Sequence, residues 1–117
     1  MGTGKTKILI IDDEVDLCIL LKKYLETKNF QVDFTHSLQD GMKLMQEIIP
    51  DILLLDNNLP DGIGWKQSDF FFSVNPALRL FLMSGYQPSL PNKEMMNYSV
   101  LQKPISFSDL EILSTGA

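Results

Sequence analysis

Short apolar runs alternate along the chain with segments that have helical periodicity. Five runs have the length of β-strands and are bounded by polar or turn-forming residues: 7–12, 30–35, 52–56, 78–83 and 99–102. Three of these runs are almost wholly apolar, which is typical of strands covered on both faces. The run at 30–35 instead alternates apolar and polar side chains, which predicts a strand with one wetter face at a sheet edge.

The intervening segments predict helices of unequal quality. Apolar side chains recur at helical spacing from Leu17 to Leu25 and from Leu38 to Ile49, where Pro50 ends the pattern. Ser37 offers an N-cap for the second of these helices. A weaker helix is expected over 65–74, at most a short one around 92–97, and a final short one after an N-cap at 106. Strands that alternate with helices predict an α/β fold, a three-layer sandwich around a parallel sheet.

Composition limits the class of protein. The chain has 117 residues, 44% hydrophobic and 21% charged, which fits one globular domain over residues 7–117 after a disordered leader at 1–6. No apolar run approaches a membrane span or a signal peptide, so we expect a cytoplasmic protein without membrane contact. The net charge of −5 argues against direct nucleic-acid binding by this chain. The single cysteine, Cys18, falls within a helical pattern and is expected to be a small buried side chain.

Chemically active side chains follow the predicted strands. Asp12 and Asp13 end the first run, Asp56 the third, Ser84 the fourth and Lys103 the fifth. The carboxyl ends of parallel strands lie at one edge of the sheet, where ligands bind in open α/β folds. Three carboxylates at one edge would repel one another unless a cation lay among them.

These residues, in this order and at strand ends, give the chain a resemblance to a known family. The chain resembles, over essentially its whole length, the receiver domain of two-component response regulators. The motifs that carry the resemblance are Ile11-Asp12-Asp13-Glu14, Leu55-Asp56 with Pro60 and Gly64, Ser84-Gly85, and Lys103-Pro104. The resemblance implies a flavodoxin-like (βα)5 sandwich with five parallel strands in the order 2-1-3-4-5.

The resemblance implies a phosphoacceptor function. Asp56 would take a phosphoryl group from a sensor histidine kinase or a phosphotransfer protein, and the modified domain would change its binding to a partner. Asp12, Asp13, Asp56 and the backbone carbonyl of Asn58 would hold Mg²⁺, a hard ion that takes oxygen ligands. The domain would assist its own phosphorylation without being a turnover enzyme.

The resemblance also implies that two further residues contact the phosphoryl group, and it implies several partners for the domain. Lys103 would place its charge beside the phosphoryl oxygens, aimed by a cis bond to Pro104, and Ser84 would donate its hydroxyl. An output domain, a partner protein or a second copy of the chain would receive the signal.

Two other functions remain open. A degenerate receiver that serves only as a protein-interaction platform is one, because Val100 replaces the Tyr or Phe that most receivers carry three residues before the lysine. Tyr98 or Tyr86 would then substitute, or the aromatic part of the switch would be absent. A phosphatase of the haloacid-dehalogenase type would need a second aspartate two residues after Asp56, where this chain has Asn58.

Overall fold

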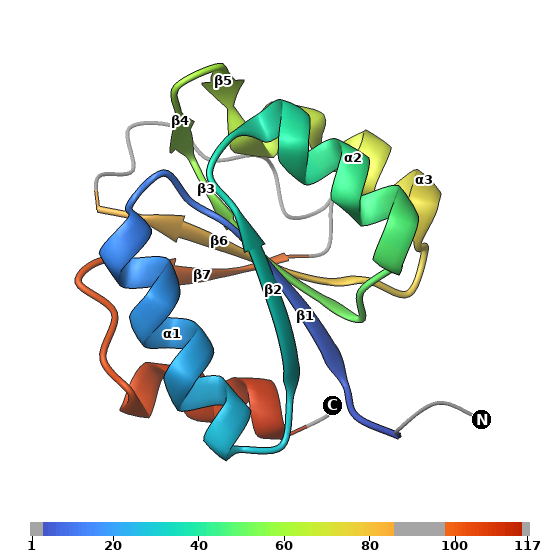
Figure 1. Ribbon diagram of the computed structural model, residues 1–117. Coiled ribbons are helices and arrows are strands. Elements are labelled where there is room, and N and C mark those ends of the chain that lie inside the picture. Colours follow the sequence, from blue (N-terminus) through green and yellow to red (C-terminus); the bar gives the residue numbers. More distant parts are fainter. Residues whose placement is uncertain (1–3, 86–97, 116–117) are drawn as a thin grey trace.

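The central element is a parallel sheet of five strands. A computed structural model describes residues 4–85 and 98–115. The strands lie in the order β2-β1-β3-β6-β7, all parallel, as predicted, with β2 at an edge (Figure 1). Their bounds are β1 Lys7–Ile11, β2 Gln31–Thr35, β3 Ile52–Asp56, β6 Arg79–Ser84 and β7 Tyr98–Gln102.

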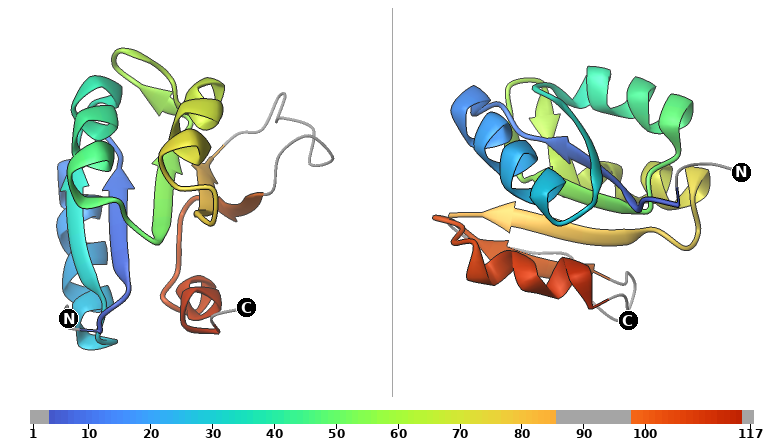
Figure 2. Two further views of the ribbon diagram at one scale, coloured as in Figure 1. Left: turned by 90° about the vertical axis from the view of Figure 1, so that its right-hand side faces the viewer. Right: turned by 60° about the horizontal axis from the view of Figure 1, so that its bottom comes forward.

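Helices cover both faces of this sheet. The helical elements are α1 Val15–Thr27, α2 Leu38–Ile48, the 3-10 turn η1 Gly64–Gln67, α3 Ser68–Val74 and the 3-10 helix η2 Ser108–Ser114. Figures 1 and 2 show α1 and η2 on one face and α2 and α3 on the other. The three-layer α/β sandwich predicted from the alternation of patterns is therefore confirmed.

Alternate residues of each strand supply the two halves of the core. Ile8 and Ile10 of β1 pack with α1 and η2, whereas Leu9 and Ile11 pack with α2 and α3. All four are fully buried. Because successive side chains of a strand point to opposite faces, a strand covered on both sides must be apolar at every position. This requirement is why the central strands read as continuous apolar runs.

The N-terminus of α2 is as predicted, but its C-terminus is not. The Oγ of Ser37 accepts a hydrogen bond from the backbone N–H of Asp40 at 3.2 Å, so Ser37 is the N-cap. At the other end, Ile49 was expected to continue the buried stripe. Instead it lies beyond the helix in the left-handed region (φ 47°, ψ 70°) and is 52% exposed. Pro50 explains the difference, because a following proline disfavours the right-handed helical conformation.

The segment after β3 is more structured than the sequence indicated. A two-stranded antiparallel hairpin, β4 Asn58–Leu59 and β5 Gly62–Ile63, follows Asp56 directly. The helix expected over 65–74 is divided between η1 and α3. The helix expected around 92–97 and Tyr86 lie outside the described residues.

Hydrogen bonds fix the backbone near both ends of the described region. The backbone carbonyl of Thr6 accepts a hydrogen bond from the N–H of Gln31 at 3.0 Å, which extends the contacts of β2 by one residue. Near the other end, Ser106 and Asp109 cap each other at the start of η2. Within residues 4–85 and 98–115, no helix has both the length and the apolar character needed to cross a membrane.

Candidate functional site

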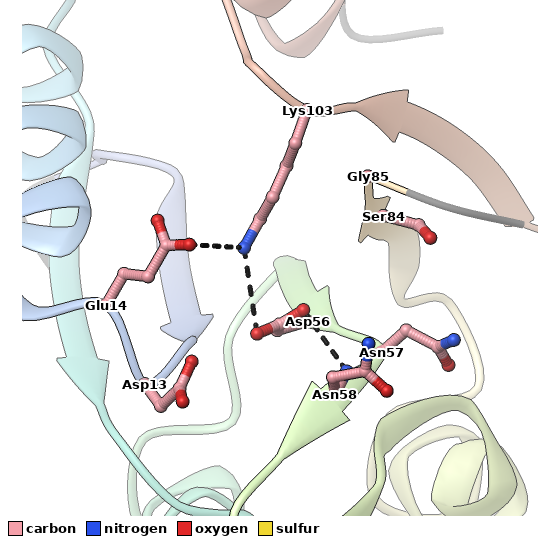
Figure 3. Close-up of a pocket in the computed structure, with 8 residues that line it drawn as sticks. All are labelled: Asp13, Glu14, Asp56, Asn57, Asn58, Ser84, Gly85 and Lys103. Atoms are coloured by element: carbon pink, nitrogen blue, oxygen red, sulfur yellow. Dashed lines mark hydrogen bonds and ion pairs between the residues drawn. The ribbon is translucent and has the colours of Figure 1, made fainter.

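The carboxyl ends of four strands meet at one edge of the sheet and enclose a pocket of about 330 Å³. Figure 3 shows its lining residues: Asp13, Glu14, Asp56, Asn57, Asn58, Ser84, Gly85 and Lys103. Asp12 lies below this surface and is fully buried, although its carboxylate contacts Lys103. The structure thus brings together the five side chains that the sequence singled out as site residues, and the backbone of Asn58 with them.

Three carboxylates form a cluster that suits a metal ion. Asp12, Asp13 and Asp56 each offer one oxygen, and these oxygens lie within 4.8 Å of one another. Asp12 and Asp56 are buried while Asp13 is exposed, so the cluster has a protein side and a solvent side. Oxygen donors with room for water match the preference of Mg²⁺, which keeps several water ligands when it binds proteins. The donor set therefore fits this ion.

The hairpin strand β4 begins beside the same cluster. The backbone N–H of Asn58 donates to Oδ1 of Asp56 at 3.2 Å, an interaction drawn in Figure 3. This bond holds the first residue of β4 against the carboxylate, so the peptide of Asn58 is within the pocket. The role of its carbonyl as a metal ligand stays a prediction.

Lys103 is the cation of the site. Its Nζ lies 2.9 Å from Oδ2 of Asp12 and 3.7 Å from Oδ2 of Asp56. A third carboxylate, Glu14, lies 3.5 Å away. The ion pair with Lys103 is the only polar contact of Asp12 Oδ2 among the residues that the structure describes. Burial by itself would lower the pKa of the ammonium, but the surrounding carboxylates outweigh burial and raise it.

The backbone around Lys103 directs its side chain into the pocket. The bond to Pro104 is cis, as the resemblance implied. The N–H of Lys103 donates to the carbonyl of Ser84 at 2.9 Å, which joins the ends of β6 and β7. In Figure 3 the side chain extends from this junction toward Asp56.

The carboxylate of Asp56 is buried, and its surroundings disfavour the charged form. Its exposed fraction is 5%. Burial and the nearby charge of Asp12 raise its pKa to about 6, against the opposing effects of Lys103 and of the Asn58 N–H. A divalent cation at the cluster would remove this penalty, because an opposite charge at close range favours the ionised form.

The other side of the pocket is polar but uncharged. Ser84 is buried at the end of β6, and Figure 3 shows its side chain on the side of the pocket away from Glu14 and Asp13. Among the described residues, a Cβ added at Gly85 would meet only Cβ of Lys103, at an ordinary 3.8 Å. The glycine therefore leaves this side of the pocket open to its described neighbours.

Sequence reasoning missed two residues of this pocket. Asn57 is buried, and its Oδ1 has no hydrogen-bond partner among the described residues. Its place directly after Asp56 was the available signal, but burial of a polar side chain depends on packing by distant elements. Glu14 was named only as the last residue of the Ile11-Asp12-Asp13-Glu14 motif and given no role in the site, yet it pairs with Lys103.

Four residues outside the pocket lining differ in how well the sequence predicted their surroundings. Cys18 is buried as expected, and burial raises the pKa of its thiol to about 12. His36, to which the sequence analysis gave no role, is half-buried with Nδ1 3.0 Å from the backbone carbonyl of Asp12. Tyr98 is a buried member of the core that α2 and α3 cover, and Val100 packs against the same core.

Known proteins share this fold and this sequence pattern. Residues 8–113 match the family model described as the response regulator receiver domain. A CheY-like receiver domain from Methylobacillus flagellatus superposes with a TM-score of 0.85 at 25% identity, over 97% of this chain and 98% of that one. A receiver domain from Methanospirillum hungatei JF-1 has the same fold, with a TM-score of 0.82 at 23% identity over 97% and 93% of the two chains.

Curated relatives include longer regulators. The transcriptional regulatory protein ZraR of Salmonella typhimurium is 25% identical over 95% of this chain and 26% of its own length. The putative positive transcription regulator of virulence factors BvgA of Bordetella pertussis is 32% identical over 78% of this chain and 44% of its own length. The chain thus spans less than half of these relatives. The family match over nearly the whole chain, together with the acidic edge of its parallel sheet, shows that this chain belongs to the receiver domains of two-component response regulators.

Proposed function

We propose that Asp56 is the phosphoacceptor of this receiver domain and that a phosphohistidine on a sensor kinase or phosphotransfer protein is the donor. One observation carries the proposal: a buried aspartate shares an acidic cluster that fits a cation with Asp12 and Asp13, and the Nζ of Lys103 lies 3.7 Å from its carboxylate. We assign residues 7–117 to the receiver unit.

The transfer needs a nucleophile and charge neutralisation. A carboxylate oxygen of Asp56 attacks phosphorus, the P–N bond to the donor imidazole breaks, and the imidazole takes up a proton as it leaves. Lys103 stabilises the charge that spreads over the phosphoryl oxygens, and the Ser84 hydroxyl donates to one of them. Asp12, Asp13, Asp56 and the Asn58 carbonyl would hold Mg²⁺, which would supply a further positive charge near the phosphoryl oxygens.

The phosphorylated domain acts by changing what it binds. Modification of Asp56 replaces one buried carboxylate by a larger dianionic group at the ends of β3, β6 and β7, which shifts the balance between two conformations. The receiver of this signal is an output domain or partner protein. Water later hydrolyses the acyl phosphate, so the domain is a signalling acceptor and not a turnover enzyme.

Phosphorylation by a small donor tests the proposal. Purified protein is incubated with acetyl phosphate and Mg²⁺, and its intact mass is measured over time. One base-labile phosphoryl group is expected on the wild type and on Asp69→Asn, an exposed carboxylate of α3 outside the pocket. No phosphoryl group is expected on Asp56→Asn or after EDTA treatment.

Three results would contradict the proposal. Phosphorylation of Asp56→Asn to the wild-type level would place the acceptor elsewhere. Sustained release of inorganic phosphate from small phosphate esters would indicate a phosphatase instead. Absence of any modification, with a partner still bound, would favour the interaction platform to which Val100 points.

A further inference from the structure

Asp61 connects the hairpin that follows Asp56 to a distant helix. It lies in the turn between β4 and β5, and both of its carboxylate oxygens accept hydrogen bonds from the first turn of α2. The N–H of Leu38 donates to Oδ1 at 2.7 Å, and the N–H of Gln39 donates to Oδ2 at 2.8 Å. These two donors lower the pKa of the Asp61 carboxyl, so it is ionised near neutral pH.

The bonds from Asp61 complete a cap that α2 begins by itself. The first N–H groups of a helix have no partners inside the helix. In α2 the side chain of Ser37 accepts from the N–H of Asp40, while its backbone carbonyl accepts the first bond of the helix itself, from the N–H of Gly41. Asp61 accepts from the N–H groups of Leu38 and Gln39, so the first turn is capped both by its own N-cap and by a residue more than 20 positions away in sequence.

The other end of the hairpin is fixed to Asp56. The N–H of Gly64 donates to the carbonyl of Asn57 at 3.0 Å. Gly64 also lies so close to the backbone carbonyl of Asp56 that an added Cβ would collide with it. The hairpin thus has two attachments, one at the end of β3 and one at the N-terminus of α2. Asn58, whose N–H bonds the Asp56 carboxylate, lies between them.

We propose that Asp61 is a positioning residue of the metal site: by holding the hairpin turn on α2, it keeps the Asn58 peptide at the position that Mg²⁺ requires. The inference rests on the proposed function, since it takes the Asn58 carbonyl as a ligand. Ligand placement matters because Mg²⁺ demands near-ideal octahedral geometry and tolerates displaced ligands poorly. Groups that orient a ligand without touching the ion commonly change metal affinity by tenfold or more.

Three variants distinguish an effect of Asp61 on the position of the hairpin from an effect of its charge or of the stability of α2. Asp61→Asn removes the carboxylate that accepts the two hydrogen bonds from α2. Asp40→Asn removes a carboxylate from the same first turn of α2 without touching the hairpin. Ser37→Ala removes the N-cap side chain that accepts from the N–H of Asp40. Mg²⁺ dissociation constants are measured by calorimetry at 0.15 M KCl, where charges more than about 8 Å apart are largely screened.

The expected result is a loss of Mg²⁺ affinity of roughly tenfold in Asp61→Asn and a change of less than about twofold in the other two variants. Hydrogen exchange gives a second readout, with faster exchange expected at the amides of Asn58 and Gly64 in Asp61→Asn but not in Ser37→Ala. Wild-type affinity in Asp61→Asn, or an equal loss in Ser37→Ala, would overturn the inference. Failure of the wild type to bind Mg²⁺ would instead refute the proposed function.

Discussion

Asp56 makes the metal-free protein less stable than it could be. Its pKa in the folded state, about 6, is above the ordinary value of 3.8, so folding disfavours the charged form. This penalty is fully present above the folded pKa and is relieved as the pH falls from 6 toward 3.8. Each pKa unit corresponds to about 1.4 kcal/mol.

The pH dependence of a variant tests this penalty. In EDTA at pH 7.5, Asp56→Asn is expected to have a free energy of unfolding about 2 kcal/mol above that of the wild type. At pH 5 this difference should shrink by about 1 kcal/mol, since wild-type Asp56 is then mostly protonated in the folded state. Urea unfolding at both pH values provides the measurement. A difference that stays constant or widens toward pH 5 would contradict the assigned environment.

Lys103 is expected to oppose metal binding while it promotes phosphoryl transfer. Its ammonium lies 2.9 Å from Asp12 Oδ2, within the cluster that fits the ion. Lys103→Met should therefore tighten Mg²⁺ binding by roughly threefold to tenfold, the effect of removing a like charge at this range. It should also slow phosphorylation by acetyl phosphate on the order of 100-fold, because a stabilising charge is lost from the transition state.

Calorimetry and the rate of mass increase measure the two effects separately. Lys43→Met, at an exposed position on α2, should leave both unchanged. Weaker Mg²⁺ binding in Lys103→Met would mean that the lysine organises the carboxylates more than it competes with the ion.

At the scale of the elements, α2 is followed by a residue in an unfavourable backbone conformation. Ile49 adopts a left-handed conformation that costs a branched side chain roughly 1–2 kcal/mol, and it exposes half of its surface. Ile49→Asn should raise the free energy of unfolding by about 1 kcal/mol, because asparagine tolerates this conformation. Thermal or urea unfolding provides the measurement. The same change at Ile19, an exposed position inside α1, should not stabilise the protein, and equal gains at both sites would contradict the backbone explanation.

The elements differ in how far the sequence specified them. The central strands were predictable because burial on both faces requires an unbroken apolar run, as in 52–56. The hairpin was not, since two strands of two residues have no periodicity to detect. Ile49 kept the helical spacing of its stripe, and only the local effect of Pro50 removed it from the helix.

At the scale of the molecule, parallel topology explains why the site was largely predictable. Every parallel strand delivers its last residue to the same edge, so an acid, a serine and a lysine at separate strand ends must be neighbours. The hydrogen bonds that hold the surrounding loops in place were not predictable. The bonds from Asp61 to α2 and from His36 to the Asp12 carbonyl are made by loop residues, and no sequence spacing fixes what a loop residue will contact.

The chemical identity of the phosphorylated side chain tests the central proposal most directly. Protein treated with acetyl phosphate and Mg²⁺ is reduced with borohydride, which converts an aspartyl phosphate to homoserine, and its peptides are sequenced by mass spectrometry. Homoserine is expected at position 56, in proportion to the phosphoryl group incorporated, and nowhere in protein that received no Mg²⁺. Homoserine at position 12 or 13, or a phosphoryl group that remains on a serine or histidine, would contradict the assignment of Asp56 as acceptor.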